Sequence, residues 1–278
     1  MVFYGRVRQL RQLLSQQEEN ISLDAAALEL ATIEFPGLDP RPFVEILDSH
    51  ARELGELAGP RASGRQFVEK ANRYFFETLG FRGNSENYYD PRNSCLNEVL
   101  TARTGIPITL SAVYIEVARR LGRPVHGIEF PSHFLIQYRG EDYTEFIDCF
   151  HGGRKLTYEE LRQMGLQVAR VDIYANPGIL RPATTWRILV RMLNNLRHIY
   201  VGSNQAPKAL MVADLLVLAK PDEAENYRDR GVILGVMGRF QAALADFTRY
   251  LSMAPDAPDR EAVEKRVTMI RKYLRSLN

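Results

Sequence analysis

Three residues in the central part of the chain have the side chains of a thiol enzyme: Cys95, His133 and Asp148. In such enzymes an imidazole takes the proton of the thiol, and a carboxylate orients the imidazole. The dipole at a helix N-terminus lowers the pKa of a thiol placed there. Cys95 follows Asn93 and Ser94, either of which can cap a helix, so the sequence places this cysteine at a helix start. The three residues are therefore the candidate catalytic set.

The segment 133–148, HFLIQYRGEDYTEFID, is predicted to be a β-hairpin that brings His133 to Asp148. Its two arms alternate between β-branched or aromatic and polar side chains around a glycine-containing turn. A two-residue loop at 140–141, counted outwards along both arms, sets His133 directly opposite Asp148. Directly opposite residues have Cβ atoms about 4.5–5.5 Å apart. We therefore expect the imidazole within about 2.6–3.2 Å of the carboxylate, on the adjacent strand.

Helices must position this hairpin, and the sequence predicts them on its N-terminal side. Apolar residues at helical spacing, with capping residues and Gly-Pro breaks, predict helices within 5–19, 22–34, 41–58 and 66–79. Two more are expected at 95–104 and 108–121, followed by a strand at 125–130. A short helix capped by Thr157 follows the hairpin.

Composition excludes several classes of function. The 278 residues suit two domains, each with its own core. A hydrophobic content of 45% and a charged content of 25% are those of an ordinary soluble protein. The net charge of +2, from 36 basic and 34 acidic residues, favours neither nucleic acid nor an anionic membrane as a partner.

The sequence also predicts the compartment and the absence of a metal. The start of the chain lacks the apolar stretch of a signal peptide, and no later stretch approaches the ~18–20 residues of a membrane span, so we expect a cytoplasmic protein. Two cysteines, Cys95 and Cys149, are too few for a disulfide framework. The spacings of His126, His133, His151 and Cys149 match no zinc pattern. We therefore predict no metal and no cofactor.

The region from about 87 to 153 resembles the transglutaminase-like core of the SirB-type invasion-regulator family. The resemblance implies an α+β, papain/transglutaminase-like fold, with helices packed on a small antiparallel sheet, and a regulatory role. It is carried by Asn87-Tyr88-Tyr89-Asp90-Pro91, Asn93-Ser94, Leu96-Asn97, Gly105-Ile106-Pro107-Ile108, Arg120-Leu121-Gly122, His133-Phe134, Asp148 and Gly152-Gly153.

The chain departs from that family at the nucleophile. In active transglutaminase-like enzymes the cysteine opens the helix before the strand, which here means residues 107–111. No cysteine is there, and Thr109 and Ser111 offer only hydroxyls. Three alternatives follow: Cys95 acts through a different geometry, a hydroxyl replaces the thiol, or the site is not catalytic. We favour the third, because a displacement of about 1 Å can already cost ~100-fold in rate.

The C-terminal part contains a helical repeat. A self-comparison finds a 34-residue offset, which matches Pro221 to Pro255 and Ala209 to Ala243. The pattern resembles two tetratricopeptide repeats followed by a capping helix at 261–277. The small and aromatic positions of the second repeat are Gly231, Gly238, Ala243, Phe247 and Pro255. We therefore predict a transglutaminase-like domain at 1–183 and helical repeats at 184–278.

Two functions follow from these patterns. The first is a non-catalytic transglutaminase-like protein that binds a protein or peptide partner and acts in regulation, because the expected cysteine is missing and helical repeats present concave binding surfaces. The alternative is a cysteine-dependent enzyme acting on amide or peptide bonds, with Cys95 as nucleophile, His133 as base and Asp148 as the group that orients it.

Overall fold

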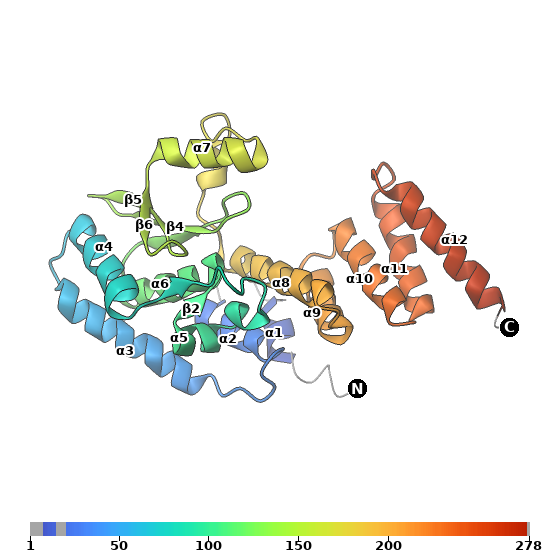
Figure 1. Ribbon diagram of the computed structural model, residues 1–278, viewed down its shortest axis with the longest axis horizontal. Coiled ribbons are helices and arrows are strands. Elements are labelled where there is room, and N and C mark those ends of the chain that lie inside the picture. Colours follow the sequence, from blue (N-terminus) through green and yellow to red (C-terminus); the bar gives the residue numbers. More distant parts are fainter. Residues whose placement is uncertain (1–7, 15–20, 277–278) are drawn as a thin grey trace. The chain divides into compact units, whose positions relative to one another are not determined.

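The structure is a computed structural model that describes residues 8–14 and 21–276 (Figure 1). The chain forms two compact units: a core unit of residues 16–192, and a repeat unit that combines residues 1–15 with 193–278. The division falls inside helix α8 (Thr185–Gly202), beyond the expected boundary at 183/184. Helix α1 (Arg8–Leu14) groups with the C-terminal helices and not with the N-terminal domain. The rest of the helix predicted at 5–7 and 15–19 lies outside the described residues.

Helix α6 (Pro107–Arg120) is the central element of the core unit. Every residue from Pro107 to Ala118 is buried. A helix that is covered on all sides belongs to a domain interior. It packs against helices of the N-terminal part. These are α2 (Leu23–Ala31), α3 (Arg41–Ala58) and α5 (Leu96–Ala102), while α4 (Gly64–Asn72), which continues as a π-helix (Arg73–Thr78), packs on α3.

The sheet of the core unit is small and antiparallel. Its four strands run in the order β3-β4-β5-β6. Their bounds are β3 (Val125–Ile128), β4 (Leu135–Arg139), β5 (Thr144–Asp148) and β6 (Arg154–Leu156). A separate two-stranded parallel pair joins β1 (Arg82–Gly83) to β2 (Thr104–Gly105). The expected α+β class is confirmed.

The hairpin of β4 and β5 exists, but its predicted register is wrong. The connecting loop spans four residues, 140–143, and is closed by a backbone hydrogen bond between its ends. Tyr138 therefore faces Glu145, two positions beyond the partner that a two-residue loop would give. The reason is a contact from outside the hairpin: the Asp142 carboxylate accepts the backbone N–H of Gly64 at 2.7 Å, at the start of α4. A two-residue turn would draw Asp142 into the strand and break this contact.

Helices cover both faces of the sheet (Figure 1). On one face α6 packs against β3 and β4. On the other face lies α7 (Tyr158–Ala169), which begins at a capping box of Thr157 and Glu160, as the sequence predicted. The buried cluster beneath α7 contains Ile128, Phe130, Leu135, Phe146, Leu156, Leu161 and Ile173. This packing fixes the ends of β4 and β5, where the candidate site lies.

The repeat unit is a series of antiparallel helices. It contains the second part of α8, then α9 (Ala206–Ala219), α10 (Ala224–Val236), α11 (Phe240–Met253) and α12 (Arg260–Ser276). Consecutive helices from α9 onward pack on one another. A Cβ atom at Gly231 would lie 2.8 Å from the ring of Phe247, so the small residue is needed for the approach of α10 to α11. The capping helix predicted at 261–277 is α12, and position 277 lies outside the described residues.

No helix within 8–14 or 21–276 is long and apolar enough to cross a membrane.

Candidate functional site

His133 contacts Asp148, as the sequence predicted. The Nε2 atom of His133 lies 2.8 Å from Oδ2 of Asp148. His133 is not on a strand, however: it lies in a turn before β4, where its backbone N–H donates to the carbonyl of Phe130 at 3.0 Å. Asp148 is the last residue of β5. The contact therefore arises because the chain bends back before β4, and not from the predicted cross-strand register.

The Asp148 carboxylate is buried and holds four hydrogen bonds. Its Oδ1 accepts the backbone N–H groups of Phe150 at 3.0 Å and His151 at 3.2 Å. Its Oδ2 accepts from His133 and from Nδ1 of His151, each at 2.8 Å. Burial raises the pKa of Asp148, but the hydrogen bonds and charges of the two imidazoles outweigh burial and lower it to about 2. The carboxylate is thus ionised at neutral pH.

His151 is the site residue that sequence reasoning missed. Its side chain is 61% exposed and reaches back over Asp148 because the loop after β5 turns sharply. The turn depends on Gly152 and Gly153, whose φ angles are +66° and +75°. The backbone N–H of Gly153 donates to the carbonyl of Asp148 at 2.9 Å and closes the loop. The available signal was an aspartate at a strand end, a histidine three positions on, and a following Gly-Gly pair.

The hydroxyl groups at the first turn of α6, where an active enzyme would carry its nucleophile, are buried. The Thr109 hydroxyl is buried, donates to the carbonyl of Asn93 at 2.6 Å, and accepts the backbone N–H of Ile106 at 3.2 Å. It therefore caps α6 and ties it to the preceding segment. Ser111 is also fully buried, and its hydroxyl lies beside the thiol of Cys149.

The two cysteines lie in different surroundings, and neither forms a disulfide. Cys95 is the N-cap residue of α5, 1% exposed, and its thiol donates to the carbonyl of Pro91 at 3.4 Å. Cys149 lies in the turn after β5 and is fully buried, with its thiol beside the hydroxyl of Ser111. Burial raises the pKa of the Cys149 thiol far above its ordinary value. A thiol held neutral in this way is a poor nucleophile.

Aromatic side chains line the chain next to His151. The ring of Phe150 lies 5.2 Å from that of His151 and 5.8 Å from that of Tyr88, measured between centroids. Tyr89, which is 67% exposed, lies beside Tyr88. These residues belong to the segment that carried the family resemblance.

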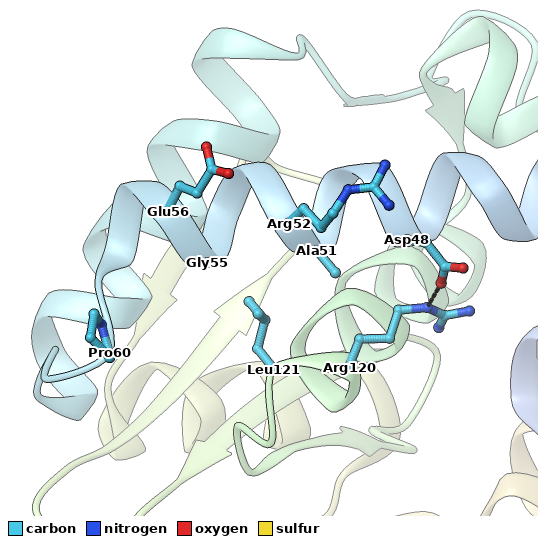
Figure 2. A pocket seen from close by; sticks show the side chains of 8 residues that line it. All are labelled: Asp48, Ala51, Arg52, Gly55, Glu56, Pro60, Arg120 and Leu121. Atoms are coloured by element: carbon cyan, nitrogen blue, oxygen red, sulfur yellow. Dashed lines mark hydrogen bonds and ion pairs between the residues drawn. The ribbon is translucent and has the colours of Figure 1, made fainter.

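A cavity of about 690 Å³ lies at the other end of α6, beside α3 (Figure 2). Its polar feature is Arg120, which donates to Asp48 at 2.7 Å, to Glu116 at 2.6 Å and to Asp24. The guanidinium is thus paired with carboxylates from α3, α6 and α2. It joins these three helices, so the polar cluster has a structural role. The lining residues are Asp48, Ala51, Arg52, Gly55, Glu56, Pro60, Arg120 and Leu121.

A buried helix against a small antiparallel sheet, with a His–Asp pair at the sheet end, defines a transglutaminase-like domain. A family model described as the transglutaminase-like superfamily matches residues 42–194. A tetratricopeptide repeat model matches residues 196–268. The two matches meet within α8, close to the division between the two units.

Similar proteins cover most of the chain. A UPF0162 protein of Xylella fastidiosa (strain 9a5c) is 37% identical over 271 residues, 96% of this chain and 93% of that protein. A UPF0162 protein of Vibrio cholerae is 29% identical over 205 residues, 71% of this chain and 73% of that protein. F-box only protein 21 of Mus musculus is 33% identical over 172 residues, 58% of this chain and 26% of that protein. The chain belongs to the SirB-type family of UPF0162 proteins, within the transglutaminase-like superfamily.

Proposed function

We propose that this protein is a non-catalytic transglutaminase-like protein that binds a segment of a partner protein and acts in regulation. The observation that carries the proposal is the closed first turn of α6. A serine or threonine nucleophile needs an accessible hydroxyl in hydrogen-bonding contact with its base. Thr109 is buried and committed to Asn93 and Ile106, and Ser111 is buried against Cys149.

The alternative, a thiol enzyme that uses Cys95, has the His133–Asp148 pair in its favour. A reactive cysteine, however, is partly exposed. Cys95 is 1% exposed, and its thiol donates a hydrogen bond to the carbonyl oxygen of Pro91 at 3.4 Å. The helix that it caps has seven residues. These features argue for a structural cysteine.

The repeat unit supplies the surface for the proposed partner. A cavity of about 300 Å³ is formed by α10, α11 and α12. Val236 and Met269 at its edge are 77% and 70% exposed, which is high for large apolar side chains. Its lining residues are Gly231, Val232, Gly235, Val236, Phe240, Phe247, Arg266, Met269 and Ile270. The chemistry fits a partner segment with an apolar anchor residue and an acidic neighbour that pairs with Arg266.

Site-specific photocrosslinking tests the proposal. A photoreactive amino acid at position 269 is expected to capture the same partner protein reproducibly. The matched control carries it at position 158 on α7, where Tyr158 is 51% exposed. Val236→Glu, which replaces an apolar side chain at the edge of the cavity with a charged one, should reduce capture at 269 by about tenfold or more. Equal capture at both positions, or capture that Val236→Glu leaves unchanged, would contradict the proposal.

A further inference from the structure

One feature of the site has no place in a catalytic pair: a second imidazole on the same carboxylate oxygen. In a triad, the carboxylate orients one histidine. Here Oδ2 of Asp148 accepts from His133 and from His151, each at 2.8 Å. One ligand atom from each of His133, Asp148 and His151 lies within 4.8 Å of those of the other two. We infer that His133, Asp148 and His151 bind a divalent transition-metal ion of the zinc type.

The two contacts to Oδ2 of Asp148 are close to the ligand separations around such an ion. Zinc binds imidazole nitrogen and carboxylate oxygen at about 2.0–2.2 Å, which places neighbouring ligand atoms about 3.0–3.5 Å apart. The two 2.8 Å contacts to Oδ2 need to lengthen by well under 1 Å to reach this separation. Each imidazole keeps its ring proton by moving it to the other nitrogen. The ion then replaces two hydrogen bonds with three coordinate bonds.

The carboxylate is already oriented as a ligand. Ligating carboxylates and histidines are held in place by further hydrogen bonds around the metal site. The Oδ1 atom of Asp148 is fixed by the backbone N–H groups of Phe150 and His151, at 3.0 and 3.2 Å. This leaves Oδ2 directed at the imidazoles.

Close packing and hydrogen bonds both hold the loop that brings His151 to Asp148. A Cβ atom at Gly153 would lie 2.4 Å from the ring of Phe76, so only glycine fits against the π-helix. The carbonyl of Gly153 accepts a hydrogen bond from the side chain of Asn72 at 2.7 Å. The ion site is therefore held on the end of β5 and on the helix beneath it.

Ligand type and exposure indicate the class of ion. Two imidazoles and one carboxylate suit zinc and its transition-metal neighbours, whereas calcium and magnesium prefer oxygen ligands alone. The side chain of His151 is 61% exposed and that of His133 is 16% exposed, so solvent reaches the ion from one side. Three protein ligands leave at least one position for water or for a donor atom of a bound molecule.

Metal titration of the full chain without a histidine tag tests the inference. After treatment with a chelator, Zn²⁺ is titrated in competition with a chromophoric chelator, and Co²⁺ is followed by its visible absorption. One equivalent should bind, with bands typical of a four- or five-coordinate nitrogen and oxygen site. His133→Ala and His151→Ala should each weaken binding by about 100-fold or more, since even outer contacts cost 10–100-fold.

His126→Gln provides the matched control, because His126 lies on β3 and is outside the cluster. Its dissociation constant for Zn²⁺ should stay within about twofold of that of the unsubstituted chain, a difference in binding free energy below ~0.5 kcal/mol. His151→Gln also removes this imidazole, at a side chain that is largely exposed. Its unfolding midpoint in urea, compared with that of the unsubstituted chain, verifies that the fold is kept. Failure to bind one equivalent, or binding that both alanine variants leave unchanged, would overturn the inference. Neither result bears on partner capture at position 269, so the two proposals fail separately.

Discussion

The loop after β5 and the first turn of α6 would form the two halves of a catalytic centre in an active relative, and here they use their polar groups in opposite ways. The loop brings His151 to Asp148, which also contacts His133, and His151 is open to solvent. Thr109 and Ser111, at the start of α6, are completely buried. His133, Asp148 and His151 thus form a polar cluster that solvent reaches at His151, whereas the first turn of α6 is part of the buried interior.

The difference teaches that the same domain satisfies its polar side chains in two ways. At the sheet end, two imidazoles supply the donors that the buried Asp148 carboxylate needs. At the start of α6, the Thr109 hydroxyl pairs with the carbonyl of Asn93 and the N–H of Ile106. Both features support folding and neither requires catalysis.

The largest predicted effect concerns the loop. Gly153→Ala adds a Cβ atom 2.4 Å from Phe76 at a φ of +75°, so steric overlap and backbone strain add together. We expect a loss of about 3 kcal/mol in the free energy of unfolding. Gly152→Ala is the matched control, since its φ is +66° but nothing lies within 4 Å of the new Cβ. It should cost about 1–2 kcal/mol from strain alone. Equal losses in urea unfolding would mean that Phe76 does not constrain the loop.

Thr109→Val tests the structural role of the buried hydroxyl at the start of α6. The change keeps the shape of the side chain and leaves the Asn93 carbonyl and the Ile106 N–H without this partner. Stability should fall by about 2 kcal/mol. Thr101→Val is the control, because the Thr101 hydroxyl bonds to the carbonyl of Asn97 within one helix and nearer the surface, and should cost under about 0.5 kcal/mol. A Thr109→Val protein as stable as the original would remove the structural role assigned to this hydroxyl.

A smaller effect is expected at the far end of α6, where the charges are structural. Burial raises the pKa of Asp24, but hydrogen bonds from Ser22 and Arg120 outweigh it and hold the pKa below its ordinary value. A carboxyl group with a lowered folded pKa stabilises the fold above its unfolded pKa of about 4, and this stabilisation is lost as the pH falls below that value. Asp24→Asn should therefore flatten the dependence of stability on pH below about 4. A curve with the original slope would contradict the pairing with Arg120.

Several parts of the fold could be predicted from sequence because they depend on local patterns. The alternation in 133–148 predicted the hairpin, and Thr157 with Glu160 predicted the start of α7. The 34-residue offset predicted the repeats, which the repeat match at 196–268 supports. These signals lie within a few residues of the structure that they specify, or recur along the chain.

The remaining features depend on contacts distant in sequence. The hairpin register was predicted wrongly because Gly64 anchors Asp142 from another element. The approach of His151 to Asp148 requires two successive positive φ angles, which sequence spacing does not report. The burial of Thr109 follows from packing on every side of α6, and no single stretch of sequence contains that information.

The most direct test of the central claim, that the site lacks a working nucleophile, is the alkylation rate of Cys95 in the native protein. Iodoacetamide is applied between pH 6 and 9, and peptide mass spectrometry separates Cys95 from Cys149. Because Cys95 is 1% exposed and bonded to a carbonyl, it should react far more slowly than a free model thiol at every pH, and reach the free rate only after unfolding. Rapid alkylation of Cys95 at or below pH 7 that His133→Ala abolishes would show a working thiol and contradict the account.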